Sequence, residues 1–390
     1  MEKLYYERPY VKRFDAIVLD CVPVPEGLFS VLLDRTAFYP EGGGQPADTG
    51  KLLDATVMDV RERPEGIVHI TDKQIPIDTV VTGEIDWERR LSHMQNHSGE
   101  HILSGLVHKH YGYDNVGFHM GKDEVTVDFN GTLTMEQMEE IETEANELIW
   151  RNIPVVESFP SKEELQKLEY RSKKELSGEV RIIEFPGADV CACCGTHVMT
   201  TGEIGIIKVT GLARYKGGVR VSMLCGSAAL SDYGKKWKSV LGISNLLSAK
   251  PDQILEAVTK LKEDGIKKEG MLNRLLTVLL EGKAAQYPVS DLPLLVFEEN
   301  LAPVQLRQFC TMLYEGKKGS IVVVCSGEDG LYQFAAGSST TDMRGFSRQL
   351  NERLNGRGGG NALMAQGTFK TSSDDIKAVF KELSGGQNGN

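Results

Sequence analysis

Three histidines recur at four-residue intervals in a segment with the apolar periodicity of a helix. His93, His97 and His101 fall within the predicted helix 87–111, and their spacing puts all three on one helical face. Cβ atoms one turn apart lie about 5–6 Å from each other, which lets two imidazoles bind one metal ion. A helical HxxxH pattern alone is more often a pair of core or surface histidines. A metal site therefore needs further ligands from another part of the chain.

The sequence CACCGTHV supplies such ligands, because Cys193 and His197 repeat the four-residue spacing. A thiolate combined with imidazole nitrogens favours zinc over magnesium or calcium. We therefore predict that Zn2+ is bound by His97, His101, Cys193 and His197. His93, Cys191 and Cys194 are alternative ligands; otherwise they are a helix-face histidine and two packed thiols. Four protein ligands usually close a structural site, so a catalytic zinc would have to gain a fifth ligand or release one.

Two glycine-rich segments could approach a ligand closely. In TAFYPEGGGQPADTG, consecutive glycines permit positive φ and close contact with the backbone, and the missing GK[ST] ending excludes a phosphate-binding P-loop. The candidate substrate-binding residues are Gly42, Gly43, Gly44 and Gln45. In NGRGGGNALMAQG, exposed backbone N–H groups beside Arg357 suit phosphate oxygens. An ordinary turn is the alternative for the first segment, and a plain helix-to-strand connection for the second.

The pattern of helices and strands expected around these residues predicts an α+β fold with four domains. Short strands broken by turns predict a small β-barrel or sandwich at the start, and an α/β pattern ends the chain. Between them, a helical hairpin or short coiled coil is expected, interrupted at Gly265 and Gly270. The predicted domains are an N-terminal β-barrel with the first glycine-rich motif (1–90), a zinc-containing α+β domain (91–232), a helical spacer (233–288) and a C-terminal α/β domain (289–390).

Composition narrows the classes of function. The net charge of −11 argues against indiscriminate binding to nucleic acid, although residues 204–231 contain no acidic residue and four basic ones. Seven cysteines, an odd number, fit no disulfide framework. There is no apolar run long enough for a membrane span and no signal-peptide pattern. We therefore expect a cytoplasmic protein with reduced thiols and no membrane partner.

The motifs, taken in order, resemble those of a known family. FYPEGGGQPADTG, HMQNHSGEHILSG and VCACCGTHV are similar to the glycine-rich, HxxxH and CxxxH motifs of the editing domain of alanyl-tRNA synthetase, which free-standing alanyl-tRNA editing proteins share. GRGGGNALMAQG resembles part of the DHH-associated domain that ends alanyl-tRNA synthetases. The whole chain thus resembles the long form of the free-standing family. Because the glycine-rich motif begins near Phe38, no class II aminoacylation core is expected before it.

The resemblance implies hydrolysis, without ATP, of the ester that joins serine or glycine to the 3′ end of alanine tRNA, at a zinc-containing site. Residues 42–45 are expected to border the pocket for the terminal adenosine, and the strand with Phe118 and His119 to form another wall. Glu100 is a candidate proton acceptor if its side chain turns inward. A homodimer through the spacer or the C-terminal domain is also expected. The candidate tRNA-binding residues are Arg344, Arg348, Arg353 and Arg357.

Two other classes of function remain open. The segment His97–His101 also reads HxxEH, the inverted zinc-peptidase motif, but a peptidase would not account for the second ligand pair or the glycine-rich loop. The other class is an RNA-binding module with a structural zinc. Such a module should unfold when its metal is removed, whereas an editing enzyme should lose hydrolysis with most of its fold intact.

Overall fold

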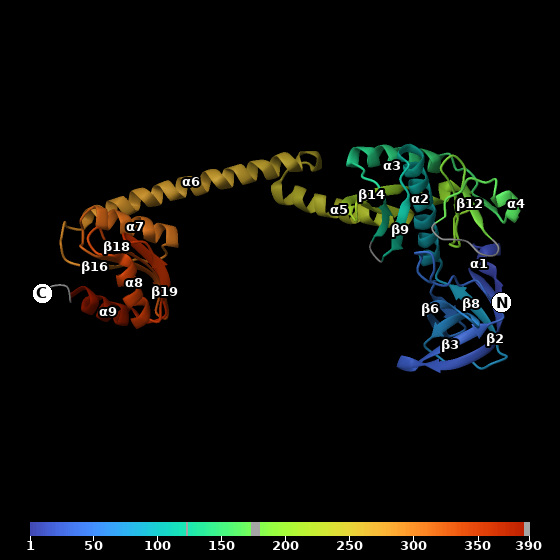
Figure 1. Ribbon diagram of the computed structural model, residues 1–390, viewed down its shortest axis with the longest axis horizontal. Helices are drawn as coiled ribbons and strands as arrows, with labels where there is room; N and C mark the ends of the chain where they lie inside the picture. Colours follow the sequence, from blue (N-terminus) through green and yellow to red (C-terminus); the bar gives the residue numbers. More distant parts are fainter. Residues whose placement is uncertain (122–123, 173–179, 386–390) are drawn as a thin grey trace. The chain divides into compact units, whose positions relative to one another are not determined.

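The computed structural model describes residues 1–121, 124–172 and 180–385, and these residues fall into two compact units that divide between residues 243 and 244 (Figure 1). Helices and mostly antiparallel sheets occur together in both units, which confirms the predicted α+β class. The finer division into four domains remains a prediction. Among the described residues, no helix combines the length and the apolarity needed to cross a bilayer.

The first unit begins with a six-stranded closed barrel in the order β2-β3-β7-β6-β5-β8. Its strands alternate buried and exposed residues; on β2, for example, Phe14, Ala16 and Val18 are buried and their neighbours are exposed. The barrel strands are β2 (Arg13–Val24), β3 (Leu28–Leu33), β5 (Gly50–Leu52), β6 (Ala55–Arg63), β7 (Gly66–Thr71) and β8 (Val80–Ile85). The short elements beside them are β1 (Glu2–Lys3), α1 (Leu4–Glu7), the 3-10 helix η1 (Pro25–Gly27) and β4 (Arg35–Thr36).

Helix α2 (Trp87–Tyr111) carries the HxxxH motif and has the predicted bounds. The side chain of Asp86 accepts a hydrogen bond from the backbone N–H of Arg89 at its start, and Gly112 adopts a left-handed conformation (φ 68°) at its end. The helix packs against α3 (Met135–Trp150) and against the sheet β14-β15-β10-β9. The strands of this sheet are β9 (Asn115–Met120), β10 (Val125–Phe129), β14 (Ile207–Tyr215) and β15 (Gly218–Cys225).

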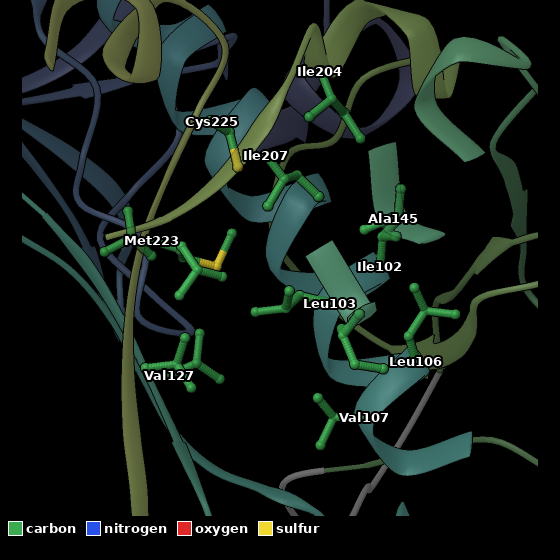
Figure 2. Packing of buried hydrophobic residues seen from close by; sticks show 14 of the residues in the cluster. Ile102, Leu103, Leu106, Val107, Val127, Ala145, Ile204, Ile207, Met223 and Cys225 are labelled. Atoms are coloured by element: carbon green, nitrogen blue, oxygen red, sulfur yellow. The ribbon is translucent and has the colours of Figure 1, made fainter. Parts of the chain in front are cut away.

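The core around α2 explains why this helix can hold a site rigidly. Apolar residues along α2 are fully buried among side chains of the sheet and of α3 (Figure 2). The residues labelled there are Ile102, Leu103, Leu106, Val107, Val127, Ala145, Ile204, Ile207, Met223 and Cys225. Helix α3 begins after the N-cap Thr134, which forms a reciprocal capping box with Gln137.

A smaller sheet, β11-β12-β13, completes the first unit and leads into the CxxxH loop. Strand β13 ends one residue before Cys193 and lies against α2, so the two ligand pairs face each other across this contact. The elements are β11 (Val156–Ser158), α4 (Lys162–Leu165), β12 (Ile182–Phe185), β13 (Asp189–Ala192) and the 3-10 helix η2 (Thr201–Ile204).

The helical region consists of α5 (Gly226–Leu247) and α6 (Ile254–Gln286), with the 3-10 helix η3 (Pro251–Gln253) between them. The predicted interruptions at Gly265 and Gly270 are wrong, because α6 continues through both residues. A glycine inside a helix costs only about 1 kcal/mol relative to alanine. The flanking leucines, lysines and glutamates favour a helix strongly enough to outweigh this cost.

The second unit contains the five-stranded sheet β16-β17-β18-β20-β19, in which only β16 and β17 are parallel. The second glycine-rich segment is not a plain helix-to-strand connection, because its residues 357–360 form strand β19, paired antiparallel with β20. The pairing brings the backbones very close: a Cβ on Gly358 would lie 2.4 Å from the carbonyl oxygen of Gln366. The elements are β16 (Leu294–Phe297), α7 (Pro303–Glu315), β17 (Val322–Glu328), β18 (Leu331–Gly337), α8 (Met343–Arg353), β19 (Arg357–Gly360), β20 (Met364–Phe369) and α9 (Ser373–Gly385).

Candidate active site and metal centre

The four side chains predicted to bind a metal converge on one point in the first unit. The nitrogen and sulfur atoms of His97, His101, Cys193 and His197 all lie within 4.8 Å of one another. Nε2 of His97 is 3.4 Å, and Nε2 of His197 is 3.3 Å, from Sγ of Cys193. A tetrahedron with zinc–ligand bonds of about 2.0–2.3 Å has edges of roughly 3.3–3.8 Å. Three imidazoles and one thiolate at this spacing fit a zinc ion.

Each of the three histidines holds its Nδ1 atom against an oxygen of another residue. The pairs are His97 with Oε1 of Gln45 at 2.9 Å, His101 with Oδ2 of Asp189 at 2.8 Å, and His197 with Oγ of Ser98 at 3.4 Å. Such contacts fix the orientation of an imidazole and leave its Nε2 atom for a metal. The partners of these Nδ1 atoms, Gln45, Asp189 and Ser98, are therefore as important for the geometry of the metal site as the four candidate ligands.

Asp189 and Arg171 form a buried ion pair behind His101. Nε of Arg171 donates to Oδ1 at 2.7 Å and its Nη2 donates to Oδ2 at 2.8 Å, while the side chain of Asp189 is 1% exposed. Burial opposes ionisation of this carboxyl, but the hydrogen bonds from His101 and Arg171 prevail and lower the pKa of Asp189 to about 2. A permanent negative charge therefore supports His101 at neutral pH. Sequence reasoning missed this pair.

The protonation states of the cluster follow from burial and mutual charge. Burial alone would raise the pKa of Cys193, but its interactions with the imidazoles of His97, His197 and His101 lower it well below its usual value. Burial lowers the pKa of His197 to about 3. Burial also acts to lower the pKa of His101, yet the thiolate of Cys193 and the carboxylate of Asp189 raise it well above 6.5. Binding of a metal at His101 should therefore release a proton.

A cavity of about 500 Å³ opens beside the cluster, and we call it the metal cavity. His97, His101 and Cys193 line it, together with the backbone of residues 42–44. Gly44 has φ +86°, and a Cβ at this position would lie 2.6 Å from the carbonyl oxygen of Phe118, so only glycine fits. Gln45 does not line the cavity. It is fully buried, and besides His97 it contacts Thr196, through Nε2 to Oγ1 at 2.9 Å.

Aromatic side chains form much of the wall of the metal cavity. Tyr5 and Tyr6 of α1 line it beside Tyr39 and Phe118. The guanidinium of Arg181 lies 5.0 Å from the ring centre of Tyr6 and donates to the carbonyl oxygens of Cys193 and Gly195. The N-terminal segment is thus connected to the CxxxH loop. No spacing rule points to these tyrosines, so the sequence did not reveal their role.

The remaining candidates of this unit have different surroundings. Glu100 is buried and lines the metal cavity, where its Oε1 accepts hydrogen bonds from Ser104 (2.6 Å) and Asn115. Cys191 belongs to a second group of ligand atoms with His101 and Asp189, which overlaps the first. Cys194 is exposed at the cavity wall. His93 lies in neither of the two groups found among the described residues.

The arginines predicted to bind tRNA lie in the second unit. Arg344 is paired with Asp342 at 2.6 Å, and Arg353 with Glu382 at 2.7 Å. A cavity of about 450 Å³ is lined by Arg344 and Arg348 together with glycines of β19. Arg357 begins β19 and is exposed. The structure thus places two of the four at one hollow beside backbone N–H groups.

Comparisons with known proteins identify sequences that are related to this chain. The family model of the threonyl and alanyl tRNA synthetase second additional domain matches residues 180–222, and that of class II (A) tRNA synthetases matches residues 22–89. The alanyl-tRNA editing protein AlaX-L of Pyrococcus horikoshii is 29% identical over 98% of this chain and 98% of its own length. An alanyl-tRNA editing protein of Danio rerio is 30% identical, covering 65% of this chain and 66% of its own. An alanine–tRNA ligase of Methanoregula boonei is 33% identical over 94% of this chain, which spans only 41% of that ligase.

Proposed function

Because the chain belongs to the family of alanyl-tRNA editing proteins, we propose that it hydrolyses mischarged tRNA(Ala) in trans and so removes serine or glycine. The reaction cleaves the ester between the amino acid and the terminal ribose. The observation that carries this proposal is the convergence of the four donor atoms, three of whose residues line the wall of the metal cavity. The cavity volume of about 500 Å³ suits an adenosine with a small amino acid.

Zn2+ held by His97, His101, Cys193 and His197 would polarise water or the ester carbonyl and orient the substrate. The protein supplies the positioning. The glycine backbone at residues 42–44 permits close approach of the terminal adenosine, and Tyr6 and Phe118 provide aromatic surface for its base. Glu100 lies in the same cavity, where its carboxylate can hold a proton of the attacking water. An aminoacyl ester is already activated, so positioning and charge stabilisation are sufficient contributions.

Discrimination against correctly charged tRNA would depend on one of the few polar groups in the largely aromatic wall of the metal cavity. The hydroxyl of serine can form a hydrogen bond that alanine cannot, and alanine would leave a buried polar group without its partner. Glycine, like alanine, lacks this hydroxyl, so the hydrogen bond favours serine alone and removal of glycine would depend on its smaller size. We expect seryl-tRNA(Ala) to be hydrolysed at least tenfold faster than alanyl-tRNA(Ala).

The second unit would supply affinity for the rest of the tRNA through contacts of its arginines with phosphates. Arg348 and Arg357 would bind phosphates directly. Arg344 and Arg353 would first have to leave their ion pairs with Asp342 and Glu382. Exposed leucines on α6, such as Leu272 and Leu275, support contacts with a second copy of the chain. We place the activity in the cytoplasm, where mischarged tRNA occurs.

The test compares deacylation of seryl-, glycyl- and alanyl-tRNA(Ala) side by side under single-turnover conditions. Rapid loss of serine and glycine with slow loss of alanine supports the proposal. Equal rates for all three would refute the specificity, and no hydrolysis of any would refute the function. Peptide hydrolysis that persists in Cys193→Ala would instead support a peptidase.

A further inference from the structure

A second large cavity lies on the other side of the wall that bounds the metal cavity. We call it the α5 cavity; its volume is about 750 Å³, and it is formed by α2, the sheet and α5. None of the four converging ligands, His97, His101, Cys193 and His197, lines it, but His93, one turn before His97, lies in its wall. Its lining residues are Pro46, Arg89, Ser92, His93, Asn96, Met120, Gly121, Glu124, Val125, Leu224, Ala228, Ser231, Asp232 and Lys235.

Two elements, the glycine-rich loop and strand β9, lie between the two cavities. On the glycine-rich loop, Gly44 lines the metal cavity and Pro46 lines the α5 cavity. On β9, Phe118 lines the metal cavity and Met120 lines the α5 cavity. The backbone N–H of Met120 donates to the carbonyl oxygen of Gly44 at 3.1 Å, which joins the two elements. Two residues span at most about 7 Å, so the two cavities are close neighbours.

The α5 cavity combines an apolar floor with a polar rim. Met120, Val125 and Leu224 provide the apolar surface that a base can contact. Lys235 and Arg89 provide positive charge for a phosphate. Such a combination suits a nucleotide, whose base and phosphate have these two different requirements.

Two carboxylates in the wall distinguish a nucleotide from a simple anion. Glu124 and Asp232 both line the cavity, and Asp232 is paired with Lys236 at 2.6 Å. Carboxylates repel inorganic phosphate, but they accept hydrogen bonds from the exocyclic amino group of cytosine. Nδ1 of His93, a residue of the same wall, is buried and has no hydrogen-bond partner among the described residues.

We propose that the α5 cavity binds the cytidines that precede the terminal adenosine in the CCA end of tRNA. This inference rests on the proposed function, in which the metal cavity holds the terminal adenosine and its amino acid. The α5 cavity then gives the enzyme affinity for the single-stranded end without contact to the helical stem. It also lets the enzyme distinguish a tRNA end from free aminoacyl-adenosine.

The experiment compares two substrates on the full chain, 3′-seryl-adenosine and the seryl-CCA trinucleotide. The wild type should hydrolyse seryl-CCA with a kcat/KM at least fivefold higher than that of seryl-adenosine. Lys235→Ala should remove most of this advantage and leave seryl-adenosine hydrolysis unchanged. Lys238→Ala is the matched control, because this residue lies on the same helix and outside the cavity wall.

A second pair of variants fills the cavity with bulk. Ala228→Tyr should abolish the preference for seryl-CCA, and Ser227→Tyr, at an exposed neighbouring position outside the wall, should retain it. Circular dichroism and urea unfolding verify that both variants fold. The inference is overturned if the wild type shows no preference for seryl-CCA, or if Lys235→Ala and Ala228→Tyr leave the preference intact. Hydrolysis of neither substrate would refute the proposed function itself.

Discussion

Replacing Asp189 by asparagine tests whether the buried carboxylate behind His101 maintains the metal site. In the wild type, this carboxylate accepts three hydrogen bonds, two from Arg171 and one from Nδ1 of His101, all between 2.7 and 2.8 Å. Asparagine has nearly the same shape but has only one acceptor oxygen and no charge. One of its N–H groups must therefore face a donor of Arg171 or His101.

The expected effects are different for stability and for the metal. Removing one partner of a buried ion pair costs about 3–5 kcal/mol, and because asparagine retains one acceptor we expect a loss of about 3 kcal/mol in the free energy of unfolding. Loss of the oxygen that orients a metal-binding histidine typically lowers metal affinity roughly 10- to 100-fold. The two effects are measured by urea denaturation of the metal-free protein and by zinc competition with a chromogenic chelator.

Asp128→Asn is the matched control. Asp128 also accepts two hydrogen bonds from one arginine, Arg220, at 2.6 and 2.8 Å, but this pair is more exposed and neither of its residues lines the metal cavity. The control should lose less stability and keep its affinity for zinc. If Asp189→Asn binds zinc as tightly as the wild type and the control do, the proposed support of His101 is refuted.

Three further predictions concern the glycine-rich loop, the barrel and the second unit. Gly44→Ala should lower both stability and the rate of deacylation, because Gly44 has a positive φ and the added Cβ would lie 2.6 Å from the carbonyl oxygen of Phe118. Gly43→Ala is the control: Gly43 also has a positive φ (+61°), but no atom lies within 4 Å of its added Cβ, so the effect in the same assays should be smaller. Burial lowers the pKa of His69 to about 4. Below pH 6.5 the imidazole of His69 is therefore protonated in the unfolded chain before it is protonated in the folded protein. The free energy of unfolding should fall by roughly 3 kcal/mol between pH 6.5 and 4. The urea midpoint of His69→Gln should therefore change less with pH across this range than that of the wild type. An equal pH dependence in both proteins would contradict the lowered pKa of His69. Arg348→Ala should weaken tRNA binding and reduce the salt slope of log K by about 0.7–0.9, with a smaller loss for the ion-paired Arg353→Ala; equal binding by the wild type and both variants would argue against tRNA contact on this surface.

Features with a local signature were predictable from the sequence. Helix α2 was predicted from its apolar periodicity, and the structure has a capping residue, Asp86, and a left-handed glycine, Gly112, at its two ends. The ligand pairs were found because the four-residue spacing of His97 and His101 is a consequence of helical geometry. That this pair and the pair Cys193 and His197 bind one metal ion was predicted only because both pairs occur in the same chain.

Features that depend on distant contacts were not predictable. Arg171 and Asp189 lie 18 residues apart, and nothing in their spacing indicates that they form a buried pair behind a histidine. Tyr5 and Tyr6 precede the barrel strands, and only the fold brings them to the metal cavity. The continuity of α6 through Gly265 was mispredicted because a local preference of about 1 kcal/mol was given too much weight.

The central claim is that one zinc ion is held by three histidines and one cysteine in the first unit. X-ray absorption spectroscopy of the zinc-loaded protein tests it most directly. The predicted result is one zinc per chain with one sulfur at about 2.3 Å and nitrogen ligands at about 2.0 Å, and with the sulfur lost in Cys193→Ala. A zinc shell without sulfur in the wild type, or no zinc bound at stoichiometric concentration, would contradict the account.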